Sequence, residues 1–291
     1  MNRTKIEWCS MTWNPVTGCY HTCEYCYARK IANRFNGNKK ETFYTYVDEI
    51  FHSKNGKILA RCCSQHICIT SSGKFVKAAY PYGFTPTLHE YRLDEPQKKT
   101  KPQTIFVCSM ADLFGEWIPD SWIEKVFEAC NKASQHKYLF LTKNPERYVD
   151  LYNGKLFPYL HKENMWFGTS ITNAEETERA ASAIGKLPIN CNTFFSIEPL
   201  HMDIASTSAW ANTGYGKWAS WFIIGAETGN NKNKVIPEKA WIDNIISDCK
   251  RDKSIYDRMF PPYRSAAPVY MKDSLLPIMG EENMKRELPW E

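Results

Sequence analysis

The run Thr-Ile-Phe-Val at residues 104–107 has an apolar or β-branched side chain at every position, and YLFL at 138–141 and WFII at 221–224 repeat the pattern. Strands without a polar face are typical of parallel sheets covered by helices on both faces. Seven segments have the composition of such strands. They are Glu7–Trp13, Thr104–Cys108, Tyr138–Thr142, Met165–Gly168, Thr193–Ile197, Trp221–Ile224 and Pro268–Met271.

Amphipathic helices are predicted between these strands. In the segment 119–134 the apolar residues recur at helical spacing up to Cys130, and the segment that begins at Pro237 repeats this spacing up to Cys249. We therefore interpret Cys130 and Cys249 as small apolar core residues. Strands that alternate with helices predict an α/β fold with a parallel sheet, and we expect a single domain over residues 1–291.

Composition narrows the class of protein without fixing its function. The 291 residues are 43% hydrophobic and 14% aromatic, which excludes a disordered chain, and the formal charge of 37 − 32 = +5 permits a nucleic-acid partner without requiring one. The cysteines number 11, and the opening residues MNRTKIEW do not resemble a secretory signal. We therefore expect a cytoplasmic protein with reduced thiols and no membrane segment.

One stretch, residues 37–101, interrupts the alternation of strands and helices. It is rich in Lys, Ser, Thr, Tyr and Gly, alternates weakly in ITSSGKFVKAAY, and leaves through a proline-rich segment. Since it is too long for a plain loop between a strand and a helix, we interpret it as an insertion, with a small hairpin, that covers one end of the sheet.

The strongest chemical signal is a cluster of three cysteines, Cys19, Cys23 and Cys26, with the spacing CxxxCxxC. Three thiolates in one loop can bind three corners of a cubane iron–sulfur cluster, whereas full cysteine ligation takes four. A structural zinc site also usually has four ligands. The motif follows the first predicted strand, where ligand sites of α/β folds gather. It therefore indicates a coordination site that is open to a substrate or cofactor.

Alternatives to this cluster stay open. A zinc site could be closed by His21, Cys9 or a distant cysteine such as Cys62. The thiols could also be without a metal. Cys62, Cys63 and Cys68 could ligate a second metal, although their spacing matches no known auxiliary motif and ordinary thiols in the insertion explain them as well.

Polar residues follow the strands at the ends where a parallel sheet forms ligand sites. A buried strand has little use for such groups unless they point into a pocket, because burying an unpaired charge is costly. The residues are Ser109, Asp112, Thr142, Lys143, Thr169, Ser170, Ser196, Glu198, Glu227, Lys272 and Asp273. For Glu198 and Glu227 the alternative is a structural ion pair with a basic neighbour, and Thr172 or Asn173 is expected to cap a helix.

The cysteine spacing, with an aromatic residue just before the last cysteine, resembles the signature of the radical S-adenosylmethionine (SAM) superfamily. Between Thr4 and Asp273, the blocks TKIEW, TWNPVTGC, IFVCSMADLFGEWIP, LTKNPERY, WFGTSIT, FFSIEPL, IIGAETG and VYMKD are similar to a phage-associated radical SAM-like family with a three-cysteine motif. The resemblance implies a partial (β/α)6-type parallel barrel, with residues 37–101 inserted after the first helix. It also implies a [4Fe–4S] cluster on the three cysteines and SAM as cofactor.

The resemblance also implies roles for residues at the strand ends. Ser170 would contact the SAM ribose and Arg179 its carboxylate. The superfamily's Gly-Gly-Glu-like turn is replaced here by CSMAD at 108–112, so Ser109 and Asp112 take its place by position only. The cofactor-binding set that we predict is Tyr25, Ser109, Asp112, Thr169, Ser170, Arg179 and Ser196.

We therefore expect a radical SAM enzyme that abstracts hydrogen from its substrate, with Glu198, Glu227, Lys143 and Lys272 as candidates for substrate binding or proton transfer. A nucleic acid or nucleotide is the first candidate substrate, because the basic run Lys98–Lys101 could contact phosphates. A peptide or small metabolite is the alternative. The chemistry requires a reductase or flavodoxin-type electron donor. A non-catalytic iron–sulfur or zinc subunit of a larger assembly is the competing hypothesis.

Overall fold

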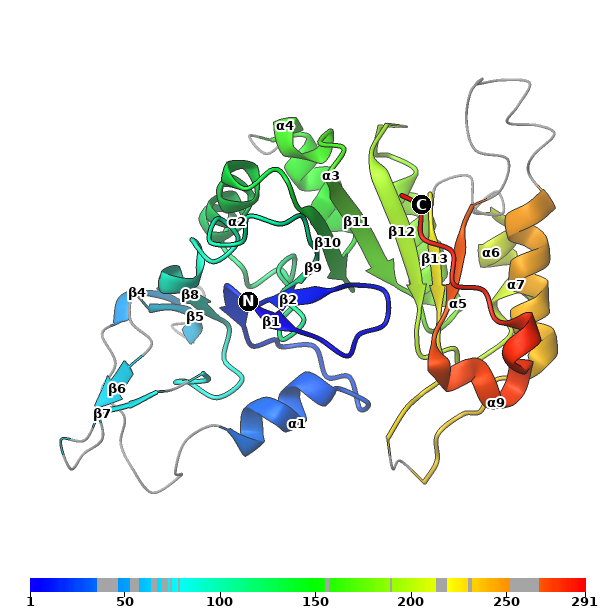
Figure 1. Cartoon of the computed structure of the whole chain (residues 1–291), viewed down its shortest axis with the longest axis horizontal. Coiled ribbons are helices and arrows are strands. Elements are labelled where there is room, and N and C mark those ends of the chain that lie inside the picture. Colours follow the sequence, from blue (N-terminus) through cyan, green and yellow to red (C-terminus); the bar gives the residue numbers. More distant parts are fainter. Residues whose placement is uncertain are drawn as a thin grey trace. The chain divides into compact units, whose positions relative to one another are not determined.

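The structure is a computed structural model, shown in Figure 1. It describes residues 1–35, 47–52, 58–63, 67–69, 73, 75–77, 79–154, 157–188, 190–212, 219–229, 232–251 and 267–291. The chain divides into two compact units, one formed by residues 1–5 and 9–140 and the other by residues 6–8 and 141–291. We call them unit 1 and unit 2 and describe each by itself. No helix among the described residues is both long enough and apolar enough to cross a bilayer.

Unit 1 contains the first strands of the predicted parallel sheet. β2 (Met11–Trp13) pairs in parallel with β9 (Thr104–Val107), β9 pairs in parallel with β10 (Lys137–Thr142), and β1 (Asn2–Arg3) pairs antiparallel with β2. α2 (Asp120–Lys132) connects β9 to β10 and buries the face that ends at Cys130, as its apolar spacing predicted. The unit therefore has the α/β order read from the sequence.

A second, smaller sheet combines β3, which precedes the stretch predicted as an insertion, with three strands from that stretch. It has the order β3-β8-β5-β4, and a separate antiparallel hairpin pairs β6 with β7 where the alternating pattern predicted one. Parts of this stretch lie outside the described residues, as do the side chains of Cys63 and Cys68. That the stretch covers the end of a barrel stays a prediction. The elements are β3 (Val16–Thr17), β4 (Val47–His52), β5 (Ile58–Cys63), β6 (Ile67–Ile69), β7 (Phe75–Lys77), β8 (Thr87–His89) and the 3₁₀ turn η1 (Glu90–Arg92).

Unit 2 contains four parallel strands in the order β11-β12-β13-β14, joined by helices. All four match predicted strands, with bounds that differ by at most two residues at either end. Its elements are α3 (Glu146–Tyr152), α4 (Phe157–Leu160), β11 (Met165–Ser170), α5 (Ala174–Ile184), β12 (Asn192–Ile197), η2 (Ile204–Ser206), α6 (Ser208–Asn212), β13 (Phe222–Ile224), α7 (Lys239–Arg251), β14 (Val269–Met271), η3 (Asp273–Leu275), α9 (Leu276–Met279) and η4 (Glu281–Asn283).

Each unit has an aromatic core. In unit 1, Phe114, Phe127 and Phe140 are fully buried and meet at ring-centroid distances of 5.2–6.3 Å. In unit 2, the ring of Trp221 packs at 6.2 Å from Trp8 and at 5.4 Å from Phe194. Tilted and edge-on rings at such distances are favourable beyond the area they bury. These cores support strand ends that carry the polar residues.

Candidate functional site

The three cysteines lie in unit 1, in the loop between β3 and α1 (Tyr27–Arg34). Gly18 begins this loop in a left-handed conformation, with φ of +89°, and its N–H donates to Met110 O at 2.9 Å. Cys19 N donates to Phe84 O at 3.1 Å, so the Cys19 backbone is held from both sides. At the other end of the loop, Cys26 is the N-cap of α1.

Backbone N–H groups point at two of the three sulfurs. The Cys26 Sγ accepts from Arg29 N at 3.3 Å, and the Cys19 Sγ accepts from His21 N at 3.4 Å. The Arg29 side chain turns back over the loop, where its Nη2 donates to Cys19 O at 3.1 Å and to His21 O at 2.7 Å. Its guanidinium also lies 4.8 Å from the centre of the Phe84 ring. Arg29 thus fastens the cysteine loop to the helix that follows it.

The Cys19 thiol is buried within this loop. Burial, followed by the charges of Asp112, Cys23 and Cys26, raises the pKa of Cys19 to about 12. A bound cation would act in the opposite direction, because it favours the thiolate. Hydrogen bonds to sulfur are also a feature of iron–sulfur sites. Among the described residues, no group of three His, Cys, Asp or Glu side chains is placed so that it could hold a metal ion.

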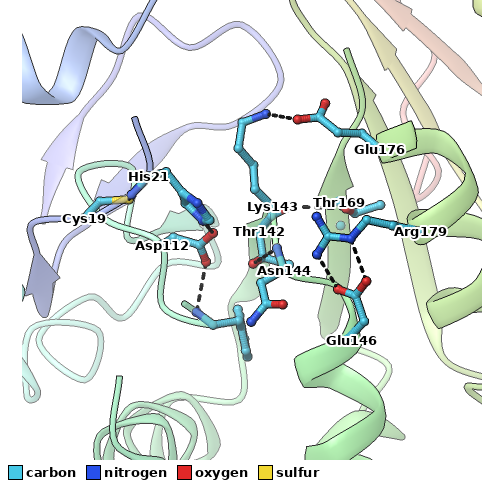
Figure 2. A network of polar contacts seen from close by, with 12 residues as sticks. Cys19, His21, Asp112, Thr142, Lys143, Asn144, Glu146, Thr169, Glu176 and Arg179 are labelled. Carbon is cyan, nitrogen blue, oxygen red and sulfur yellow. Dashed lines mark hydrogen bonds and ion pairs between the residues drawn. The ribbon is translucent and has the colours of Figure 1, made fainter. Parts of the chain in front are cut away.

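The loop after β9, with the sequence CSMAD, lies against the cysteine loop. His21 Nε2 and Asp112 Oδ2 are 2.9 Å apart, and the buried Asp112 also accepts from Phe114 N at 3.0 Å through Oδ1 (Figure 2). The Tyr27 hydroxyl donates to Ser109 O at 2.7 Å. Ser109 and Asp112, predicted from position as cofactor ligands, are therefore brought beside the three cysteines.

Backbone strain marks the start of the CSMAD loop. Cys108 is buried and has φ of +58°, a value that residues with a side chain rarely adopt. Asn14, which the sequence did not single out, holds the next two residues: its Oδ1 accepts from Ser109 Oγ at 3.2 Å and from Met110 N at 3.0 Å. The loop is thus kept in one conformation where it meets the cysteines.

Unit 2 carries a second group of polar side chains, at the carboxyl edge of β11–β14. Lys272 Nζ donates to Glu198 Oε1, and both side chains are largely shielded from solvent, with 17% and 25% exposure. Gly225 leaves room for this pair, because a Cβ atom there would lie 3.1 Å from the Lys272 side chain and 3.2 Å from that of Glu198. Glu198 and Lys272, which were predicted from two different strand ends, therefore form one ion pair.

The second carboxylate of this edge has a partner of its own. Glu227 Oε2 and His201 Nε2 are 3.1 Å apart, and the Glu227 side chain is only 7% exposed. His201 was not singled out from the sequence, where nothing but its place three residues after Glu198 pointed to it. Both Glu198 and Glu227 thus have a basic neighbour, as expected if they form structural ion pairs. That they line a substrate pocket is a proposal.

Lys143 belongs to a network at the amino end of α5. Its Nζ lies 2.9 Å from Glu176 Oε1 (Figure 2). Glu176 Oε2 accepts from both the N and Oγ1 of Thr172 at 2.7 Å. Burial opposes the ionised Glu176, but the Lys143 charge and these hydrogen bonds hold its pKa below the ordinary value. Asn173 caps the helix, as predicted, by accepting from Glu176 N at 2.9 Å.

Arg179, one turn further along α5, forms a two-pronged contact with Glu146 of α3. Its Nε and Nη2 each donate to a separate carboxylate oxygen at 2.8 Å, as Figure 2 shows. The hydrogen bonds with Glu146 raise the pKa of Arg179 and, against the effect of burial, lower that of Glu146. The resemblance implies that this guanidinium contacts the SAM carboxylate. A carboxylate ligand bound to Arg179 would have to compete with Glu146.

The remaining predicted cofactor ligands are distributed over both units. Tyr25, half-buried, lies in the cysteine loop of unit 1. In unit 2, Thr169 donates from Oγ1 to Thr142 O at 3.2 Å, and Ser170 is paired with Ser196 in the register of β11 and β12. Thr169 and Ser196 are buried. Arg29, Asn14, His201, Glu146 and Glu176 are contacts that only the folded chain shows.

The fold is that of an α/β protein with mostly parallel strands, and its candidate site includes a loop with three cysteines. The chain matches, over residues 3–257, the model of a family described as a protein of unknown function, DUF5131, and it belongs to that family. No curated protein matches its sequence.

Solved structures of spore photoproduct lyase also match the chain. One is a cysteine-to-serine mutant, with 12% identity, a TM-score of 0.45 and coverage of 93% of this chain and 78% of that one. A complex with dinucleoside spore photoproduct has 12% identity, a TM-score of 0.41 and coverage of 88% and 74%. A mutant with bound AdoMet and dinucleoside spore photoproduct has 10% identity and a TM-score of 0.42; the match covers 81% of this chain and 60% of that structure's length.

Proposed function

We propose that the chain is a radical SAM enzyme that binds a [4Fe–4S] cluster on Cys19, Cys23 and Cys26 and cleaves SAM reductively. The observation that carries the proposal is the cysteine loop itself. It places all three cysteines between β3 and α1, and backbone N–H groups are directed at the sulfurs of Cys19 and Cys26. The resemblance of the CxxxCxxC spacing to the superfamily signature supplies the type of cluster.

Three protein ligands on a cubane cluster leave one iron for a ligand from outside the chain. When bound, the cluster would supply the electron that splits SAM and so produces the deoxyadenosyl radical. The protein would hold the cysteine loop in place and exclude water from the cluster. Arg29 keeps the loop carbonyls in place, and His21 with Asp112 fastens the loop to the CSMAD segment. Ser109 lies where an additional contact to SAM would be expected.

The groups at the edge of unit 2 support a role in substrate binding or proton transfer. Lys272 Nζ holds a proton beside Glu198 Oε1, and Glu227 Oε2 lies against His201 Nε2. Each pair combines an acceptor with a donor, so that a polar substrate group could replace one partner without leaving the other buried and unpaired. Lys143 offers a third such donor next to Glu176. We assign substrate contacts to Glu198, Glu227, Lys143 and Lys272.

For SAM, we assign Ser170 and Arg179 to the ribose and carboxylate, with Tyr25, Thr169 and Ser196 in the same cofactor-binding set. A guanidinium that already makes two parallel bonds with Glu146 has the geometry that a carboxylate needs. The SAM carboxylate would take the place of Glu146. An Arg179→Lys variant keeps the charge but loses the fork, and we expect it to raise the KM for SAM more than it lowers kcat.

A nucleic acid or nucleotide is the substrate that we propose. Lys98, Lys99 and Lys101 are exposed in unit 1, although Lys98 already pairs with Asp94 at 2.7 Å. Cations in such a run contact phosphates, and binding then weakens linearly with the logarithm of salt concentration. Titration of a labelled single-stranded oligonucleotide at two salt concentrations tests this. The absence of binding at low salt would refute a nucleic-acid polymer as substrate.

The function is tested by anaerobic reconstitution with iron and sulfide. We expect about four iron atoms per chain, a content that Cys23→Ala abolishes. The control variant is Cys9→Ser, because Cys9 is half-buried, lies outside the motif and is a proposed fourth ligand of the zinc alternative. Normal iron content in Cys9→Ser supports the proposal. One tightly bound zinc, lost in both variants, would establish the competing hypothesis of a non-catalytic metal-binding subunit.

A further inference from the structure

The helix that follows the cysteine loop presents an apolar stripe to solvent. Tyr27, Ile31 and Phe35 are exposed at 50%, 36% and 57%, and they are spaced four residues apart on α1 and its C-cap. The opposite side of α1 is the packed one, where Ala28 and Ala32 are buried. Residues four apart on a helix form one continuous strip. Three large apolar side chains are thus gathered on a short exposed face.

Positive charge accompanies this strip. Lys30 and Arg34 are exposed, and each follows an apolar residue of the strip, Tyr27 or Ile31, by three positions. The Arg34 guanidinium lies 5.5 Å from the centre of the Phe35 ring. No acidic residue occurs from Tyr27 to Arg34. We call the surface formed by Tyr27, Lys30, Ile31, Arg34 and Phe35 the α1 face. It combines an apolar centre with two cations, which favours a partner with surface carboxylates.

The α1 face begins next to the cysteine loop. Cys26 caps the first turn of α1, and the helix rises 1.5 Å per residue, so that Phe35 lies about 13 Å along the axis from Cys26. A partner seated on this face is held beside the loop that carries the three thiols. Tyr27, the residue next to Cys26, also contacts the CSMAD loop through its hydroxyl, which donates to Ser109 O.

We propose that the α1 face is the docking surface for a small acidic redox protein, such as a flavodoxin, that reduces the metal centre. The proposal rests on the function given above. The docked donor would be oxidised by one electron, and a cluster held by the three cysteines would be reduced by one; no bond would be made or broken. Carboxylates of the donor would pair with Lys30 and Arg34, and its apolar rim would cover Ile31 and Phe35.

Binding of the full-length chain to an immobilised flavodoxin tests the proposal. The variants are the charge reversal Lys30→Glu/Arg34→Glu and the apolar truncation Ile31→Ser/Phe35→Ser. A matched control, Lys232→Glu/Lys234→Glu, changes the net charge by the same amount at two exposed lysines elsewhere. We expect the charge reversal to weaken binding roughly tenfold at low salt and the truncation to weaken it several-fold at any salt, with the control within about twofold of wild type.

Three results would overturn the proposal. The wild type could show no binding to flavodoxin, or both variants could bind as it does. The variants could also lose affinity for a single-stranded oligonucleotide and keep it for flavodoxin, which would make the α1 face a surface for bases and phosphates. The proposed function is judged separately, from SAM cleavage by the wild type with dithionite. Failure of that reaction with flavodoxin binding intact would refute the enzyme activity and leave the docking surface established.

Discussion

Replacing Gly18 by alanine should displace the cysteine loop at its first residue. Gly18 has φ of +89°, and an added Cβ would lie 2.4 Å from Thr85 O and 2.7 Å from Pro86 N. These are backbone atoms, which cannot turn aside as a flexible side chain can. Since Gly18 directly precedes Cys19, relief of the clash has to move either the loop or the segment before β8.

The expected loss of stability has two parts. A left-handed backbone costs a residue with a Cβ about 1–2 kcal/mol, and forcing an atom into a packed site costs about 1–3 kcal/mol. A loss of about 3 kcal/mol would lower the Tm of unit 1 by roughly 6–12 °C. The control is Gly73→Ala, because Gly73 also has a positive φ, of +78°, but no atom of the described residues lies within 4 Å of its added Cβ. It isolates the backbone cost.

Thermal unfolding followed by circular dichroism, with iron content after reconstitution, measures both effects. Gly18→Ala should have the lower Tm of the two variants and should bind less iron than the wild type. Equal Tm values for Gly18→Ala and Gly73→Ala, together with full iron content, would show that the tight contact does not fix the cysteine loop.

Further predictions concern both units. Gly168→Ala places a Cβ 2.3 Å from the Phe194 ring, and we expect a loss of about 1–3 kcal/mol in urea unfolding; an unchanged midpoint would refute the packing. Glu176 has a pKa lowered from 4.5, chiefly by Lys143 acting against burial, so its stabilisation is complete above that value and is lost as the pH falls through the lowered pKa. In acid unfolding, Glu176→Gln should therefore be less stable than wild type at neutral pH and approach it as the pH falls through the lowered pKa; a constant difference would contradict this. Arg29→Met removes two hydrogen bonds to loop carbonyls and should broaden the EPR signal of the reduced cluster, whereas Arg29→Lys should do so less; identical spectra would exclude a positioning role.

Much of the α/β order could be predicted from the sequence because buried parallel strands are apolar at every position. The predicted strand Glu7–Trp13 is the informative exception, since only Met11–Trp13 joins the sheet. Trp8 belongs instead to unit 2, where it packs against Phe194 and Trp221, and Glu7 pairs with Arg286 at 3.1 Å. Contacts between residues so far apart along the chain leave no local pattern to read.

The smaller sheet of unit 1 was also beyond sequence reasoning. β3 has two residues and β8 three, too few for an alternation to be recognised. The candidate site also has some features that could be predicted from the sequence and others that could not. Cysteine spacing and polar strand ends are local signals, whereas the contacts of Arg29 with the loop carbonyls and of Arg179 with Glu146 depend on how distant turns pack.

The measurement that tests the central claim most directly is the formation of 5′-deoxyadenosine from SAM by the reconstituted full chain under dithionite. The proposed radical SAM chemistry predicts deoxyadenosine from the wild type and from Cys9→Ser, and none from Cys23→Ala. A wild-type chain that holds about four iron atoms and yet forms no deoxyadenosine would contradict it.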